Sequence, residues 1–425
     1  MIFFYRILTF FLYPFFVLFI FLRKIKKKEH SIRYKEKIFP WHFKVSRDKN
    51  KKLLWFHTAS IGEFKSIIPI IEKLDEKDKN LEFLITTVTL SSGELAETYV
   101  KRFSNIQHRY LPIDIGFLTN KFINLWKPHS LFLVDSEIWP NLIISAKKNK
   151  ILLALINARI TSKSFKRWML VKNLAEKIFG SFDFCLSSSK ETNDYLKKLM
   201  VKNTIYTGNI KLINNSLDKI DSSESLLVPQ KKVWMALSTH LGEEKLCIQT
   251  HLFLKKNFKN LMTVIAPRHI ERVYEIKDIC DQFNLKSQVI KKDDKILDDS
   301  EILIINFFGN LNKYLEASSS VFIGKSTIKK FEKVGGQSPI EAAKLGCKIY
   351  HGPYVSNFKE IYEVLSQNGI TILINNFEEL GGYLVSDLKQ LNKDTKKFYN
   401  LMDSLGQKTL QNTMKSLNRY LFNEI

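Results

Sequence analysis

At 425 residues the chain exceeds the length that one hydrophobic core usually supports, so we expect about two domains. Its 66 Lys and Arg residues against 43 Asp and Glu leave a formal charge of +23, which favours an anionic partner unless the lysines simply form a solvated surface. The basic residues are spread along the chain and form no arginine-rich stripe, so we expect no nucleic-acid partner. Widely spaced cysteines exclude a zinc motif and predict reduced core thiols at Cys185, Cys247, Cys280 and Cys347.

The N-terminal segment departs from this soluble composition. Residues 2–22 are apolar or aromatic apart from Arg6, Thr9 and Pro14, which is about the length that spans a bilayer. A basic cluster at 23–28 follows directly, and no small-residue cleavage site is evident. The pattern predicts an uncleaved anchor that leaves the rest of the chain in the cytoplasm, attracted to anionic lipids of the inner membrane. A helix that lies on the membrane without crossing it is the alternative.

After this segment, short apolar runs alternate with amphipathic stretches, which is typical of βαβ units in mostly parallel sheets. We expect strands at 53–56, 83–87, 131–134, 151–156, 182–186 and 204–207, then at 233–237, 261–265, 302–305, 320–323, 348–350 and 370–373. The polar stretch between the two series has linker composition. The predicted organisation is an anchor at 1–28, a Rossmann-like domain at 29–212, a linker at 213–232 and a second Rossmann-like domain at 233–425, whose last helix packs back on the first.

Carboxylates follow the predicted strands of the first domain. Glu63 lies in the sequence HTASIGEF after the first strand, where open α/β sheets bind ligands, and is a candidate base. Ser60 and Glu63 also have the spacing of a helix capping box, which is the plainer interpretation of this segment alone. Asp135 and Glu137 follow the strand at 131–134 and would point to one side if the chain stays extended. Lys211 adds a cation after the strand at 204–207.

In the second domain, polar residues again follow strands. Arg268 and His269 come after the strand at 261–265, and a phosphate is a suitable ligand for the arginine. The segment GGQSPIEAA, from Gly335, has the entry of a helix whose free amides would hold a phosphate, although Ser338 and Glu341 also have capping-box spacing. A loop at 308–310 and another at 238–244 would lie at the same edge. There is no strand-associated GxGxxG or P-loop motif.

The ordered set of these motifs resembles the Kdo transferases of Gram-negative lipopolysaccharide assembly. The resemblance extends from HTASIGEF through the turn at 135–141, NAR at 157, GNIK at 208, STHLGEE at 238 and PRH at 267 to GGQSPIEAA at 335. It implies a GT-B glycosyltransferase that moves 3-deoxy-D-manno-octulosonate (Kdo) from CMP-Kdo to a lipid A precursor, lipid IVA, with inversion. It also implies that no cofactor or metal is needed. Asp135 replaces the family's usual glutamate, and GGQS replaces its usual GGHN.

The same resemblance assigns roles to individual positions. Glu63 would be the general base, and Asp135 and Lys211 accessory catalytic residues. The CMP-sugar would bind to the second domain, at Arg268, His269, Phe308, Gly309, Asn310, Ser338, Pro339, Ile340 and Glu341. The first domain would bind the acceptor, and the enzyme would act at the cytoplasmic face of the inner membrane. The number of sugars transferred, the acyl pattern of the acceptor and the oligomeric state are not indicated.

There are two alternatives, one within enzymes and one from another functional class. Another GT-B enzyme, a nucleotide-diphosphosugar transferase or epimerase, would use similar helix amides for a different donor. A membrane-anchored basic adaptor would bind polyanions without catalysis. The carboxylates Glu63 and Asp135 at strand ends disfavour the adaptor, because a polyanion-binding cleft has little use for them.

Overall fold

The computed structural model describes residues 2–41, 43–213, 231–292, 294–307, 309, 311–318, 320–389 and 395–423. The chain divides into two compact units. Unit 1 comprises Met1–Ser216 together with Gly406–Ile425, and unit 2 comprises Leu217–Leu405. Most of the expected linker, at 214–230, lies outside the described residues.

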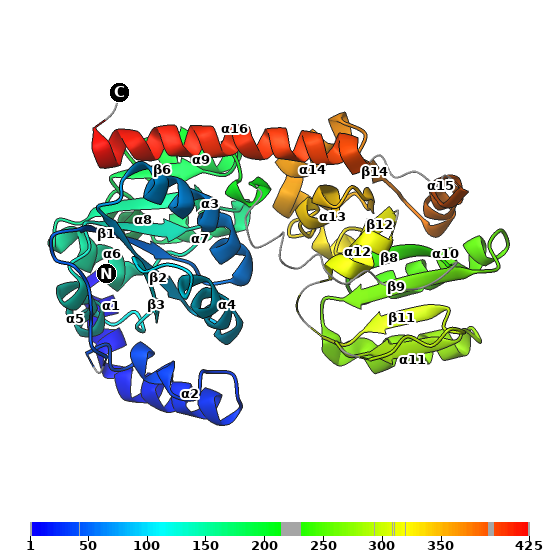
Figure 1. Cartoon of the computed structure of the whole chain (residues 1–425), viewed down its shortest axis with the longest axis horizontal. Coiled ribbons are helices and arrows are strands. Elements are labelled where there is room, and N and C mark those ends of the chain that lie inside the picture. The colour runs from blue at the N-terminus through cyan, green and yellow to red at the C-terminus, as the bar shows by residue number, and fades with distance from the viewer. Residues whose placement is uncertain are drawn as a thin grey trace. The chain divides into compact units, whose positions relative to one another are not determined.

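Each unit is built on one parallel sheet with helices on its faces (Figure 1). In the described part of the chain, both sheets have seven strands, ordered β3-β2-β1-β4-β5-β6-β7 in unit 1 and β10-β11-β9-β8-β12-β13-β14 in unit 2. The strands of unit 1 are β1 (Lys52–His57), β2 (Leu81–Thr87), β3 (Ile106–Tyr110), β4 (Ser130–Val134), β5 (Leu152–Ala158), β6 (Phe184–Ser187) and β7 (Thr204–Tyr206). Those of unit 2 are β8 (Lys232–Thr239), β9 (Leu261–Pro267), β10 (Ser287–Ile290), β11 (Ile302–Ile305), β12 (Ser320–Ile323), β13 (Lys348–His351) and β14 (Thr371–Leu373).

The helices alternate with these strands. In the first part of the chain they are α1 (Ile2–Phe11), α2 (Tyr13–Ile25), α3 (Ile61–Lys77), α4 (Leu90–Val100), α5 (Gly116–Trp126), α6 (Pro140–Lys148), α7 (Ser162–Leu170), α8 (Lys172–Phe179) and α9 (Lys190–Lys198). Those that follow are α10 (Glu243–Lys255), α11 (Val273–Gln282), α12 (Asn312–Ala317), α13 (Ile340–Lys344), α14 (Lys359–Gln367), α15 (Phe377–Lys389) and α16 (Thr395–Phe422). Short 3-10 turns are η1 (Arg33–Lys37), η2 (Ile210–Leu212), η3 (Ile270–Arg272), η4 (Lys329–Phe331) and η5 (Ser356–Phe358).

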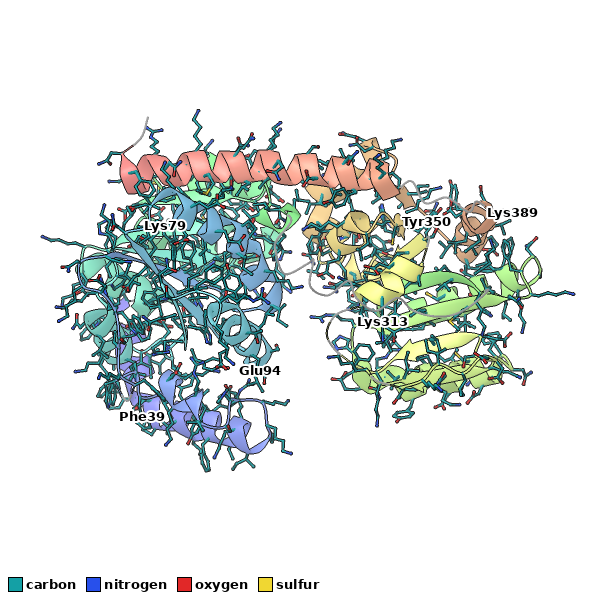
Figure 2. All side chains as sticks on the ribbon, in the orientation of Figure 1. Phe39, Lys79, Glu94, Lys313, Tyr350 and Lys389 are labelled. Carbon is teal, nitrogen blue, oxygen red and sulfur yellow. The ribbon has the colours of Figure 1, made fainter. Side chains whose placement is uncertain are left out.

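The cores explain why the strands read as continuous apolar runs. Helices cover both faces of a parallel sheet, so strand residues are buried on either side. In unit 1 the side chains of Trp55 and Trp126 are buried in the core, and in unit 2 those of Trp234 and Tyr350 are. Figure 2 labels Tyr350. All four cysteines are free and buried, as expected.

Two strands were not expected from the sequence, and both lie at sheet edges. β3 and β10 each end the strand order of their sheet. An edge strand has only one neighbour, so half-exposed polar residues such as Gln107 and Gln288 replace the apolar run that marks a central strand.

The N-terminal segment forms two helices instead of the single expected anchor helix. α1 and α2 meet at Leu12 with a bend of 56°. Pro14 lies in the first turn of α2, where its missing N–H is tolerated. In the middle of one continuous helix from 2 to 25, the same proline would break the helix. Among the described residues, no single helix is long and apolar enough to cross a membrane. Only α1 and α2 taken together have the necessary length and apolar composition.

Polar contacts join these helices to the rest of unit 1. The Tyr5 hydroxyl donates to the Oδ2 of Asp114 at 3.0 Å, and the Asn141 side chain donates to Thr9 Oγ1 at 3.2 Å. Asp114 also accepts from the backbone amides of Asn141 and Leu142 at the start of α6. Burial raises the pKa of the Asp114 carboxyl, while these hydrogen bonds act in the opposite direction.

The C-cap of α5 supplies a test of local backbone strain. Lys127 ends this helix with φ at 44°, in the left-handed region that favours glycine. We expect Lys127→Gly to raise the free energy of unfolding by about 0.5 kcal/mol, measured by urea denaturation, because the relieved strain exceeds glycine's added unfolded-state entropy. Lys121→Gly, at an exposed position inside the same helix, should lower it by about 1 kcal/mol. Equal destabilisation by both changes would contradict the assignment.

Candidate functional site

The carboxyl ends of β1 and β4 form the switch point of the first sheet. These strands are neighbours, and the strand order runs in opposite directions on either side of them. At such a point the following loops diverge and leave the crevice where doubly wound sheets bind ligands. Residues 58–60 follow β1 and residues 135–139 follow β4, so the predicted carboxylates of both loops meet there.

Glu63 lies at this point in the first turn of α3, and it forms a cap. The Glu63 amide donates to Ser60 Oγ at 3.4 Å, and Ser60 Oγ donates to Glu63 Oε1 at 2.9 Å. The second carboxylate oxygen accepts from the Ala59 amide at 2.7 Å, one residue earlier than a standard capping box requires. Both the capping interpretation and the predicted position at a strand end are therefore realised in one residue.

The environment of Glu63 makes its carboxyl a weaker acid. Burial is the largest cause of its raised pKa, and the negative charges of Asp135 and Glu137 raise it further. The hydrogen bonds from Ala59 and Ser60 lower it. A carboxylate with a raised pKa is a better proton acceptor near neutral pH than an ordinary glutamate.

Asp135 and Lys211 form the second component. Asp135 is buried, and its Oδ2 accepts from Lys211 Nζ at 2.5 Å. Asp135 Oδ1 is also buried and accepts no hydrogen bond from the part of the chain that the structure describes. Lys211 lies in η2, where its amide donates to the Asn209 side chain. The structure thus brings together Glu63, Asp135 and Lys211. The first and the last of these residues are 148 positions apart in the sequence.

The chain after β4 does not stay extended, so the expected alternation of Asp135 and Glu137 is wrong. Asp135 has φ at 63°, in the left-handed region, and the chain turns there. Aspartate adopts this conformation more readily than most residues. Both carboxylates still act on the pKa of Glu63, because the turn keeps them at the same edge of the sheet.

Sequence reasoning gave no role to His57 and Trp139, which hold Glu137. The Trp139 indole donates to Glu137 Oε2 at 2.8 Å, and His57 Nε2 lies 3.4 Å from the same oxygen. His57 is fully buried, and its Nδ1 contacts Thr86 Oγ1 at 2.9 Å. The segment HTASIGEF did contain a signal, because His57 ends a central strand there. Its partner Glu137, however, lies 80 positions away in the sequence.

The predicted nucleotide residues lie in unit 2. Arg268 and His269 follow β9 and are exposed, and the Arg268 amide donates to the Thr239 carbonyl. Ser338 precedes α13, whose N-cap is Pro339, and its Oγ accepts from the Ile340 amide at 3.4 Å instead of the Glu341 amide of a capping box. Glu341 is exposed and Ile340 is buried. Gly309 has φ at 140°, whereas Phe308 and Asn310 lie outside the described residues.

Comparison with known proteins identifies the family. A family model described as 3-Deoxy-D-manno-octulosonic-acid transferase (kdotransferase) matches residues 33–214. A 3-deoxy-D-manno-octulosonic acid transferase of Rickettsia bellii is 31% identical over 422 residues, which cover 98% of this chain and 97% of the relative. The chain belongs to the Kdo transferase family. A Kdo transferase of Haemophilus influenzae is 28% identical and covers 73% of this chain and 73% of its own length.

Family membership makes the protein a glycosyltransferase and excludes the non-catalytic adaptor. The fold agrees with this assignment. A UDP-GlcNAc 2-epimerase from Neisseria meningitidis bound to UDP-GlcNAc has a TM-score of 0.58 and 15% sequence identity, and the match covers 88% of this chain and 100% of that one. At that identity the likeness shows only the shared arrangement of two Rossmann-like units. The predicted α/β GT-B fold is thereby confirmed.

The Asp135–Lys211 pair gives a prediction about stability. Asp135→Asn keeps a residue that accepts the left-handed conformation but removes the buried charge beside Lys211. We expect the free energy of unfolding to fall by about 1–3 kcal/mol in urea denaturation, less than for a fully buried pair because the Lys211 side chain is 27% exposed. The exposed Lys73–Glu76 pair is the control, and Glu76→Gln should change stability by less than about 0.5 kcal/mol. Equal effects would show that burial does not strengthen the Asp135 pair.

Proposed function

We propose that the protein transfers Kdo from CMP-Kdo to a hydroxyl of a lipid A precursor, with Glu63 as the general base. The observation that carries the proposal is the carboxylate of Glu63 at the switch point, with a raised pKa and Asp135 and Glu137 nearby. Family membership supplies the reaction type, and the site supplies a proton acceptor at the position where such sheets bind their ligands.

The reaction is a single displacement. The acceptor hydroxyl oxygen attacks the anomeric carbon of Kdo while its proton passes to the Glu63 carboxylate. The bond between that carbon and the phosphate oxygen breaks, and CMP leaves with the electron pair. Attack opposite the leaving group inverts the configuration of the anomeric carbon.

The cap does not prevent Glu63 from acting as this base. Each carboxylate oxygen has two lone pairs, and each oxygen accepts one hydrogen bond, from Ala59 or from the Ser60 hydroxyl. A second lone pair on either oxygen is available for the acceptor hydroxyl. The cap then fixes the carboxylate in place, so little reorganisation is needed before proton transfer.

Asp135 and Lys211 act on the charge that develops during transfer. Positive charge grows on the anomeric carbon as the phosphate departs, and the buried carboxylate of Asp135 stabilises it. The Lys211 ammonium contacts Asp135 Oδ2 at 2.5 Å and holds this carboxylate in place. In unit 2, the cation of Arg268, with His269 and the Ser338–Glu341 segment, binds the CMP moiety, whose negative charge increases on departure.

Glu63→Gln tests the base. The amide cannot accept the proton, so we expect transfer to fall at least about 100-fold, while the dissociation constant for CMP stays unchanged. Transfer is measured by mass spectrometry of the lipid after incubation with CMP-Kdo and tetraacylated lipid A precursor, and CMP binding by calorimetry. Near-normal turnover would show that Glu63 serves only as a cap.

The pH dependence provides a second measurement on the same residue. The base must be deprotonated, so kcat should fall as pH falls through the pKa of Glu63, at a higher pH than for an ordinary glutamate. Glu137→Gln removes one of the charges that raise this pKa and should move the acidic limb to lower pH. Glu76→Gln, on the exposed surface of α3, should leave the limb in place.

We also infer that α1 and α2 attach the enzyme to the cytoplasmic face of the inner membrane by lying in the interface instead of crossing it. Of 26 exposed large hydrophobic side chains in the described chain, 13 belong to residues 3–25. Phe3, Phe11 and Phe15 are 70%, 74% and 61% exposed. Lysines at 26–28 follow, where anionic headgroups attract them. Exposed apolar side chains and a neighbouring lysine cluster both strengthen attachment to an anionic membrane surface.

The contacts of α1 and α2 with unit 1 support the interfacial arrangement. A crossing helix would separate Tyr5 from the buried Asp114 and Thr9 from Asn141, and both hydrogen bonds would be lost. At the end of α2, Arg23 pairs with the buried Glu29 at 2.6 Å, and Lys37 bonds to the other oxygen of the same carboxylate.

The membrane proposal predicts a change in vesicle binding. Phe3, Phe11 and Phe15 replaced together by Ser should reduce cosedimentation with phosphatidylglycerol-containing vesicles at least about tenfold. Leu170→Ser, which alters an 85% exposed leucine elsewhere in unit 1, is the control and should bind as the original does.

A cysteine at position 2, in a protein whose four buried cysteines are replaced by Ala, should react with an impermeant maleimide only in inverted membranes. Reaction from the periplasmic side would show that the helices cross.

A further inference from the structure

The switch point of the second sheet lies between β8 and β12. These strands are neighbours, and the loops that follow them are residues 240–242 and Gly324–Thr327. Two non-glycine residues at this edge adopt left-handed backbone conformations: Ser238 has φ at 57°, and Lys325 has φ at 58°. Strained backbone of this kind persists only where the surrounding structure holds it, and it is common at ligand sites.

One carboxylate joins the two loops. Glu243 begins α10, is fully buried, and accepts hydrogen bonds from four backbone amides and one hydroxyl. The donors are His240 N at 3.0 Å, Lys325 N at 2.6 Å, Ser326 N at 2.9 Å, Thr327 N at 3.1 Å and Thr327 Oγ1 at 2.9 Å. These hydrogen bonds satisfy both oxygens of the buried carboxylate and fix the two loops relative to each other.

Hydrogen bonds hold both the backbone amide and the backbone carbonyl of Lys325. Its amide donates to Glu243 Oε2, and its carbonyl accepts from the Gly336 amide at 2.7 Å. Gly336 belongs to the GGQSPIEAA segment that contains Ser338–Glu341. The loop that carries Lys325 is therefore bonded directly to a segment of the predicted nucleotide site.

The Lys325 side chain lies beside Phe331 of η4, and ring contacts connect Phe331 to the residues that follow β8 and β9. Its Nζ lies 5.7 Å from the centre of the Phe331 ring. The rings of Phe331 and His240 pack edge to face with their centres 5.1 Å apart, and the rings of His240 and His269 do so with their centres 5.6 Å apart. Burial lowers the pKa of His240, and the charges of Lys325 and His269 lower it further, which places the Lys325 ammonium near this imidazole.

We propose that Glu243 is a positioning residue that holds Lys325 in its left-handed conformation, and that the Lys325 ammonium binds an anionic group of the sugar nucleotide. This inference rests on the proposed function. The anionic group is the phosphate of CMP or the carboxylate of Kdo, which present the same chemistry to an ammonium. The Gly336 amide bonds to the Lys325 carbonyl, and His269 contacts His240, so two segments of the predicted nucleotide site lie near the Lys325 loop.

Lys325→Gly is the decisive variant, because it removes the ammonium and suits the left-handed backbone. The melting temperature should stay the same or rise, since the strain is relieved. The KM for CMP-Kdo should rise about tenfold with little change in kcat, the effect of one lost ionic contact. The dissociation constant for CMP distinguishes the two anions. It should rise by the same factor if the phosphate is bound and stay constant if the Kdo carboxylate is bound.

Two controls separate position from charge. Lys330 Nζ lies 5.1 Å from the same Phe331 ring but on the exposed η4 turn, so Lys330→Ala should leave KM within about twofold. Glu243→Gln loses acceptor capacity toward the Lys325 loop and should raise KM as Lys325→Gly does, with a lower melting temperature. In the double variant the rise in KM should be no larger than in Lys325→Gly alone.

Asp387 provides the structural control for Glu243. It accepts from Ser320 Oγ at 2.7 Å, Lys348 Nζ at 3.0 Å and the Tyr350 hydroxyl at 2.5 Å, toward the amino ends of β12 and β13 (Figure 2 labels Tyr350). Asp387→Asn should lower the melting temperature and leave KM unchanged.

The outcomes distinguish this inference from the proposed function. If the unaltered enzyme binds CMP and transfers Kdo but Lys325→Gly has normal KM and normal CMP affinity, the assignment of Lys325 is wrong and the proposed function stands. An equal rise in KM for Glu243→Gln and Asp387→Asn would show that Glu243 acts only through stability. An unaltered protein that neither binds CMP nor uses CMP-Kdo would overturn both.

Discussion

The parallel pairing of all strands is the constraint from which the functional geometry follows. Parallel strands place every strand-to-helix turn at one edge of a sheet. Where the strand order reverses, at β1 and β4 in unit 1 and at β8 and β12 in unit 2, neighbouring turns diverge. Backbone amides at these turns need acceptors, and glutamate carboxylates provide them: the partly buried Glu63 for Ala59, and the buried Glu243 for the Lys325 loop. The same carboxylates thereby place the chemical groups of the site.

The two switch points use carboxylates in different electrostatic states. Glu63 is partly buried near two other acids and accepts only one backbone amide bond, so its pKa is raised and it remains able to gain a proton. Glu243 accepts hydrogen bonds from five donors and serves to hold the two loops in place. This difference follows from the number of donors at each turn and not from the residue type. It explains how glutamates after the first strand of each sheet are suited to proton transfer in one unit and to loop placement in the other.

The sequence predicted the α/β class and twelve of the strands because central parallel strands are continuous apolar runs. It did not predict β3 and β10, whose edge positions permit polar residues. Glu63, Asp135 and Lys211 were predicted as strand-end residues, yet the contact between Asp135 and Lys211 joins loops 76 positions apart and depends on a left-handed turn that alternation does not describe. The roles of His57 and Lys325 depend on similarly distant partners, Glu137 and Glu243, which no local pattern connects.

The C-terminal helix α16 determines when unit 1 can be completed during synthesis. Its residues from Gly406 onward belong to unit 1, where Thr409 lies against Gly208 and Tyr420 stacks on Phe184 with ring centres 4.0 Å apart. The ribosome releases this helix only after all of unit 2 has been made. The β6 and β7 side of the unit that carries Lys211 therefore stays uncovered until unit 2 has been made, and the unit made first is completed only after the second.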